Sequence, residues 1–149
     1  MKKPQVIAQS ENFKAIDLGS LSEISQYEFI HPKFNTSDKA RIFIGELLET
    51  SGAEISFREL PPKTSIPFLH QHKTHEEIYI FLKGSGKIQV DDTVFPVREG
   101  SVVKVTTKGS RTLASDTNLT YMVVQAQAHS LNNYNVLDGQ RVEGEIKIG

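Results

Sequence analysis

A succession of short β-type segments separated by turn residues occupies most of this chain and constrains its fold more than any other feature. Residues 53–60 alternate in polarity, with Ile55 and Phe57 on one face and polar side chains on the other, as in a half-buried strand. Asp91-Asp92 separates two segments that read as a hairpin. Closely spaced strands with almost no helix predict an all-β sandwich, jelly roll or small barrel. The predicted strands are residues 53–60, 68–70, 77–83, 87–90, 93–97, 102–105, 111–115 and 119–127.

The first 40 residues lack a clear period, although their Phe, Ile and Leu content is too high for a solvated tail. This arm is expected to pack on the barrel, with a strand at residues 13–18 and a strand or helical turn at residues 27–30. A helix of one or two turns is predicted at residues 45–50 and ends at Gly52. We expect a single domain over residues 1–149. It would comprise an N-terminal arm at about 1–44, a barrel core at about 53–128 and a C-terminal tail at about 129–149.

Composition argues against several classes of partner. The 17 basic and 18 acidic residues are scattered along the chain, so nucleic acid is not expected to bind. No stretch approaches the ~20 apolar residues that span a bilayer, and no membrane association is expected. A polar run at residues 9–12 stands where a signal peptide would be apolar, and the chain has no cysteine. These features favour a cytoplasmic location.

Two histidines one residue apart, His70 and His72, are the clearest chemical signal. In an extended strand, side chains two residues apart project to the same face, so both imidazoles can point at one ion. Together with the carboxylate of Glu77 they form a ligand set suited to Fe(II), Mn(II), Ni(II), Cu(II) or Zn(II). The pattern predicts a divalent transition-metal site on β-structure, with open positions for water or substrate.

The spacing from His70 to Gly84 resembles the first motif of the cupin superfamily. That motif runs glycine, five residues, His-x-His, three or four residues, glutamate, six residues and glycine. The histidine pair, Glu77 and Gly84 match it, whereas Thr64 stands at the first glycine. The motif has six residues between its glutamate and its last glycine, and this spacing to Gly84 selects Glu77, rather than the adjacent Glu76, as the ligand. The resemblance implies a cupin-type double-stranded β-helix, or jelly-roll barrel, with a metal at its mouth.

The second cupin motif is degenerate in this chain. It runs glycine, five residues, Pro-x-Gly, two residues, histidine, three residues and asparagine, and its histidine is a further metal ligand. Anchored on Gly100, the motif keeps only its opening glycine and places Arg111 at the histidine. A guanidinium is always protonated and cannot coordinate a cation.

Three arrangements of Arg111 remain open. In the first, His70, His72 and Glu77 still hold the metal, and Arg111 docks a substrate carboxylate or phosphate beside it. In the second, Arg111 forms an ion pair with Glu77, the metal is lost, and the pocket binds an anionic or polar small molecule without metal. In the third, Arg111 points outward and says nothing about the cavity.

Tyr79 and Phe81 share the parity of Glu77 and are expected to line the same cavity, where the Tyr79 phenol can donate a hydrogen bond. A strand that is apolar on both faces must be covered on both, and a barrel buries only its inside. The outer cover is either the N-terminal arm or a second subunit, and we favour a homodimer. This outer face carries Ile78, Ile80 and Leu82.

Other polar residues are weaker candidates. His75 is expected on an exposed turn, and His31 and His129 are expected to be structural or solvated. Gln125 and Gln127 share one face of a late strand, where either one reaches the cavity or both lie on a solvated edge.

Two function classes fit these features, and the fold does not choose between them. The first is a metal-dependent enzyme acting on a small polar, anionic molecule: a dioxygenase, an isomerase or a decarboxylase. Tyr79 and Arg111 are then the candidate catalytic or substrate-positioning residues. The second is a metal-free small-molecule binding or sensing module without turnover.

Overall fold

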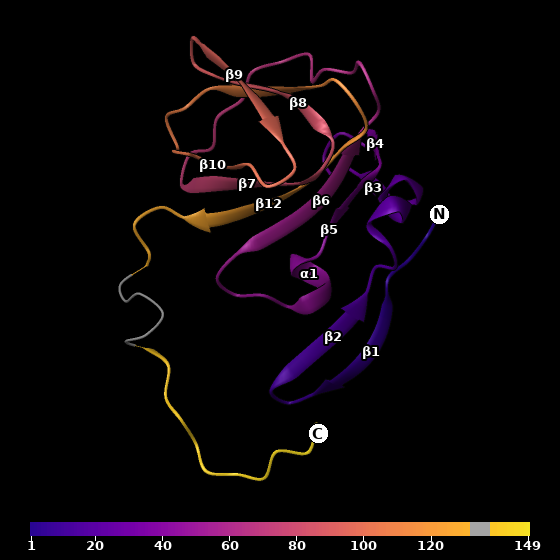
Figure 1. Ribbon diagram of the computed structural model, residues 1–149, viewed down its shortest axis with the longest axis vertical. Helices are drawn as coiled ribbons and strands as arrows, with labels where there is room; N and C mark the ends of the chain where they lie inside the picture. The colour runs from indigo at the N-terminus through magenta and orange to yellow at the C-terminus, as the bar shows by residue number, and fades with distance from the viewer. Residues whose placement is uncertain (132–137) are drawn as a thin grey trace.

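The computed structural model describes residues 1–131 and 138–149, and its architecture is the expected all-β barrel. Two antiparallel sheets form the barrel (Figure 1). The larger sheet contains, in spatial order, β10 (Val102–Val105), β7 (His75–Lys83), β12 (Leu119–Gln127), β6 (Glu54–Leu60) and β5 (Arg41–Phe43). The smaller sheet contains β11 (Arg111–Ser115), β8 (Ser85–Val90) and β9 (Thr93–Arg98).

The turns between these strands follow from the residues predicted to make them. Gly84 lies between β7 and β8 with a φ of 86°, a conformation that a residue with a Cβ rarely adopts. The predicted hairpin is confirmed, because β8 and β9 pair in register from Ser85 opposite Arg98 to Val90 opposite Thr93.

The main core lies between the inner faces of the two sheets. Alternate residues of β7 and β12 point into it, so that the rings of Tyr79, Phe81 and Tyr121 pack together. Ile88 and Leu113 close the core from the smaller sheet, and both are almost fully buried.

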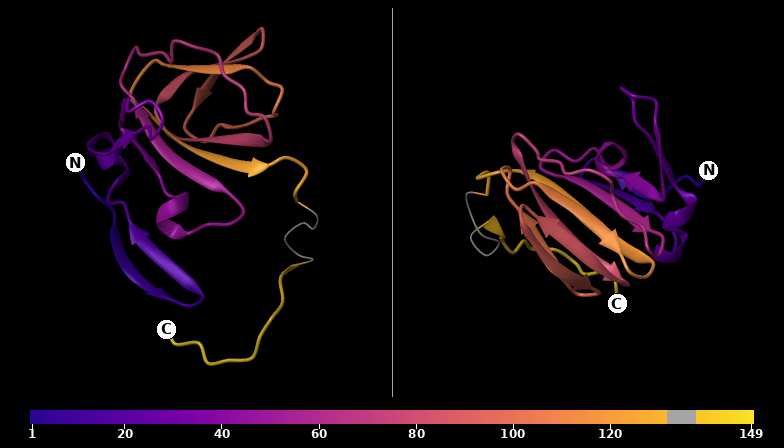
Figure 2. Two further views of the ribbon diagram at one scale, coloured as in Figure 1. Left: turned by 180° about the vertical axis from the view of Figure 1, so that it is seen from behind. Right: turned by 90° about the horizontal axis from the view of Figure 1, so that it is seen from above.

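The N-terminal segment contains more structure than its sequence predicts. The expected strand at 13–18 and the expected helix at 45–50 are present, but β1, β4, β5 and a 3-10 helix were not predicted. The hairpin of β1 and β2 stands away from the barrel in Figure 1 and in the left view of Figure 2, and β1 is exposed along its length. The elements are β1 (Gln5–Ser10), β2 (Phe13–Asp17), η1 (Leu21–Gln26), β3 (Glu28–Ile30), β4 (Ser37–Lys39) and α1 (Gly45–Leu48).

A second apolar cluster joins this segment to the outside of the larger sheet. Ile24 of η1 and Tyr27 are buried against the outward face of β6, which carries Ile55 and Phe57. The polar face of β6 therefore points into the barrel, the reverse of what a half-buried strand ordinarily does. This cluster also includes Ile42 of β5, so the sheet begins ahead of the expected core boundary at about 53.

The C-terminal segment leaves the barrel after β12 and is exposed over residues 138–149 (Figure 2). Residues 132–137 of the expected tail lie outside the described residues. Within residues 1–131 and 138–149, no helix is long and apolar enough to cross a membrane.

Candidate metal and ligand site

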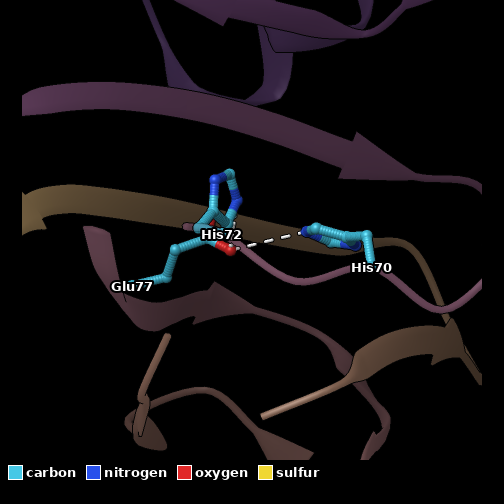
Figure 3. Close-up of side chains that lie close together, drawn as sticks. All are labelled: His70, His72 and Glu77. Carbon is cyan, nitrogen blue, oxygen red and sulfur yellow. Dashed lines mark ion pairs between the residues drawn. The ribbon is translucent and has the colours of Figure 1, made fainter. Parts of the chain in front are cut away.

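His70 and His72 approach one carboxylate, but not from a common strand as expected. Only His70 pairs as a strand residue, through a single bridge in which its backbone exchanges hydrogen bonds with Arg111 at 3.2 and 3.1 Å. His72 lies in the loop between this bridge and β7. The loop carries both imidazoles to Glu77 of β7 (Figure 3). One candidate ligand atom from each of the three residues can be chosen so that all lie within 4.8 Å of one another.

A single oxygen of Glu77 is the hub of the cluster. Oε1 lies 3.0 Å from His72 Nε2 and 3.5 Å from His70 Nε2, and it accepts a hydrogen bond from the Tyr79 hydroxyl at 3.2 Å. Burial alone would raise the pKa of Glu77, but the His70 hydrogen bond and the charges of His72 and Arg111 lower it to about 2. Glu77 is therefore a carboxylate at neutral pH despite being buried.

The histidines are suited to coordination. Burial lowers the pKa of His72, which keeps its ring neutral and leaves a nitrogen lone pair available. His70 Nδ1 is buried and has no hydrogen-bond partner among the described residues. Two imidazoles and one ionised carboxylate form the donor set that divalent transition metals accept, so the three residues fit such an ion.

Arg111 lies beside this cluster, as the motif anchored on Gly100 requires. Its side chain is 1% exposed and donates to Glu77 Oε1 from Nε at 3.0 Å and from one terminal nitrogen at 2.7 Å. The other terminal nitrogen donates to the Gly109 carbonyl at 2.7 Å and to the His70 carbonyl at 3.5 Å. The hypothesis that Arg111 points outward is thus wrong. Arg111 also does not line the cavity, so the geometry does not provide the substrate contact expected of it.

Tyr79 and Phe81 differ in position although both point inward. Tyr79 lines the cavity as expected and donates to Glu77. Burial and the Glu77 charge raise the pKa of Tyr79, so its hydroxyl stays protonated. Phe81 lies in the core beneath, 1% exposed, and the expectation that it lines the cavity is wrong.

A cavity of about 360 Å³ opens beside the cluster, within the size range of small-molecule sites. Its walls are mainly aromatic and aliphatic, and Gln125 faces it from β12. Two arginines also line it, Arg41 of β5 and Arg58 of β6. Sequence reasoning missed both, because β5 was not predicted and the polar face of β6 gave no sign of pointing inward.

The structure also shows where the weaker candidate residues lie. His75 begins β7 rather than lying in a turn, and its ring contacts Gln125 at 3.5 Å. Glu76 has the opposite parity to Glu77 on β7 and so projects from the other face of the sheet. His31 lies at the cavity wall, where its Nδ1 accepts backbone hydrogen bonds from Lys33 and Phe34.

Comparisons with known proteins agree with this architecture. The family model of the cupin domain matches residues 56–124. A cupin protein from Bacteroides fragilis is similar in structure with a TM-score of 0.67 and 30% identity, covering 76% of this chain and 98% of that one. The chain belongs to the cupin superfamily.

Two further proteins are similar over a smaller part of the chain or at lower identity. An uncharacterized protein from Methanocaldococcus jannaschii is 34% identical over 88 residues, which are 56% of this chain and 68% of that one. The structure of a predicted oxalate decarboxylase from Thermotoga maritima shares the fold, with a TM-score of 0.56 at 21% identity. It covers 72% of this chain and 96% of its own.

Proposed function

We propose that this cupin binds a divalent transition metal through His70, His72 and Glu77 and holds a small anionic molecule beside it. The observation that supports this most is the convergence of the three ligand groups within 4.8 Å at the wall of the 360 Å³ cavity. A bound molecule would lie against the ligands, enclosed by the apolar wall.

The residues around the metal position have separable tasks in this proposal. When bound, the metal would supply a Lewis acid or an oxygen-activating centre with open coordination positions. Arg111 keeps Glu77 ionised and fixes its orientation through two hydrogen bonds. Tyr79 donates a proton in a hydrogen bond and does not act as a base, because its pKa is raised. The Gln125 amide is a polar contact for a bound molecule.

One observation favours a second candidate, a metal-free binding or sensing protein. Arg111 and Glu77 form a buried ion pair in which the guanidinium faces the carboxylate that would ligate the metal. A fixed cation at this place opposes the binding of a divalent ion, because like charges at short range repel each other strongly in a partly buried site.

Metal content distinguishes the two candidates. We would purify the protein anaerobically and compare its metal content by elemental analysis with that of a His70→Ala/His72→Ala variant. Stoichiometric metal in the natural protein and loss in the variant support the metal site. A His129→Ala variant, at an exposed position outside the cavity, is the control and should retain the metal. Equal, near-zero metal in all three proteins would contradict the metal-binding proposal and leave the metal-free binder.

We further propose that the protein forms a homodimer through the outer face of β7 and β10. Ile78 and Ile80 point outward there, and Val102, opposite Ile80 in register, is 64% exposed. Light scattering should show a dimer that dissociates in Val102→Glu. Val94→Glu, at a similarly exposed position on β9, should remain dimeric. A monomeric natural protein would contradict this arrangement.

A further inference from the structure

The second polar group of the cavity is a pair of arginines on neighbouring strands. Arg41 and Arg58 are direct partners in the register of β5 and β6, and both line the cavity. Like charges directly opposite each other on a sheet repel, so such a pair requires an anion to stabilise it.

Asp38 satisfies this requirement only in part. One oxygen of its carboxylate accepts a hydrogen bond from Arg41 at 2.8 Å, and the other accepts from Arg58 at 2.9 Å. Two guanidiniums carry about ten N–H donors together, and one carboxylate cannot accept hydrogen bonds from most of them. The Nε atoms of both arginines are buried and have no hydrogen-bond partner among the described residues.

The charge of the cavity region leaves room for one further anion. Among described residues, Arg41, Arg58 and Arg111 are the arginines that line the cavity or bond to its lining, and Asp38 and Glu77 are their carboxylate partners. Without a bound metal, three positive and two negative groups leave one positive charge when the histidines are neutral. A carboxylate neutralises this charge, whereas a phosphate monoester carries about −1.5 to −2 at neutral pH and exceeds it.

Aromatic side chains surround the arginine pair. The Arg41 guanidinium lies over the ring of Phe43, with Cζ 4.5 Å from the ring centroid. Phe29 packs on Phe43 with ring centroids 4.6 Å apart, and both rings line the cavity. Phe68 lines it as well and is 61% exposed. A molecule that places its anionic end on the arginines therefore has apolar surface around the rest of its body.

We propose that Arg41 and Arg58 bind the carboxylate of a small organic monoanion with an aromatic or aliphatic body. This rests on the proposed function in that it assigns the ligand class of the same cavity. The arginine pair, rather than Arg111, is then the anion-binding group, because the N–H groups of Arg111 already donate hydrogen bonds within the protein.

Calorimetric titration with benzoate, phenylacetate and hexanoate, each at up to millimolar concentration, tests this proposal. Benzamide, which has the shape of benzoate without its charge, is the matched ligand control. At least one carboxylate should bind, and benzamide should bind about tenfold more weakly than benzoate or worse, as expected for loss of a hydrogen bond to a charged group. Failure of all three carboxylates to bind, or equal affinity for benzamide, would overturn the proposal.

Three variants of the arginine cluster and one surface control assign the binding to the arginine pair. Arg41→Gln and Arg58→Gln should each weaken carboxylate binding about tenfold, whereas Arg98→Gln, at an exposed position on β9, should not change it. Asp38→Asn should strengthen binding, because it removes the competing anion from both guanidiniums. A purely structural role would weaken binding in Arg41→Gln, Arg58→Gln and Asp38→Asn alike, and that result would overturn the proposal.

The same titration separates this inference from the metal-binding proposal. Carboxylate binding that persists in His70→Ala/His72→Ala but is weakened about tenfold in Arg58→Gln supports the arginine site whether or not the protein holds metal. Binding that is lost in the histidine variant and unchanged in both arginine variants would place the carboxylate on the metal and overturn the inference, leaving the metal site intact.

Discussion

The guanidinium of Arg111 donates to Oε1 of Glu77 at 2.7 Å, although the two residues are 34 positions apart in the chain. The same oxygen lies 3.0 Å from His72 Nε2. Glu77 is therefore shared between a permanent cation on the inner side and two candidate metal ligands on the cavity side. The ion pair with Arg111 stabilises the protein, whereas coordination by Glu77 would hold a metal. The stability of the protein and its metal affinity therefore both depend on this one carboxylate.

Replacing Arg111 with Met should strongly destabilise the protein. The substitution leaves the buried Glu77 without its cation, and breaking a buried ion pair in this way costs about 3–5 kcal/mol. Urea denaturation of metal-free protein measures the loss. Arg98→Met, at an exposed position, is the control and should change the free energy of unfolding by less than about 0.5 kcal/mol. Similar stabilities of the two variants would show that the ion pair contributes little.

Replacing Arg111 with His should increase metal affinity. The change removes a cation from the ligand cluster and adds a neutral imidazole near Glu77. Competition with a chelator would show slower or weaker metal removal from the variant than from the natural protein. Unchanged or faster removal would mean that a side chain at this position cannot reach the metal.

Acid should remove the stabilisation that Glu77 provides in metal-free protein. Its pKa is lowered from 4.5 to about 2 on folding, so its contribution is complete above pH 4.5 and is lost as the pH falls towards 2. Because other carboxyl groups titrate in the same range, the measurement is the difference in unfolding free energy between the natural protein and Glu77→Gln. This difference should narrow as the pH falls through that window. A constant difference would contradict a lowered Glu77 pKa.

The N-terminal segment should unfold together with the barrel. Ile24 of η1 is fully buried in the cluster on the outside of β6, so Ile24→Ala should destabilise the protein by about 2–5 kcal/mol. Ile7→Ala in the exposed hairpin is the matched control, with little expected effect because that side chain is 65% exposed. A single transition in thermal unfolding, shifted only by Ile24→Ala, is the expected result. Separate transitions would show that the segment is independent.

Gly84 should not tolerate a Cβ atom. Its φ is 86°, and an added Cβ would meet the backbone carbonyl of Asn118, which cannot move as a flexible side chain can. Gly84→Ala should therefore lower the free energy of unfolding by about 2 kcal/mol or more. Gly52→Ala meets nothing within 4 Å and should leave stability unchanged or slightly raised. Equal stability of both variants would contradict the strained position of Gly84.

Local patterns along the chain determined the barrel and the three candidate ligands. Strand alternation and turn residues act over a few positions, so the β8–β9 hairpin and the inward parity of Glu77 and Tyr79 could be predicted. The approach of His70 and His72 to Glu77 also follows from short spacings, although a loop rather than one strand brings them there.

Only the tertiary structure decided what surrounds those ligands. An antiparallel bridge places Arg111 against His70, and no short-range pattern shows that its guanidinium turns to Glu77 rather than to the cavity or outward. Alternation likewise shows that β6 has two different faces but not which one is inside. The N-terminal segment settles this by covering Ile55 and Phe57, which turns Arg58 into the cavity. Contacts between distant segments are made by packing and by charge pairing, and these depend on the folded chain as a whole.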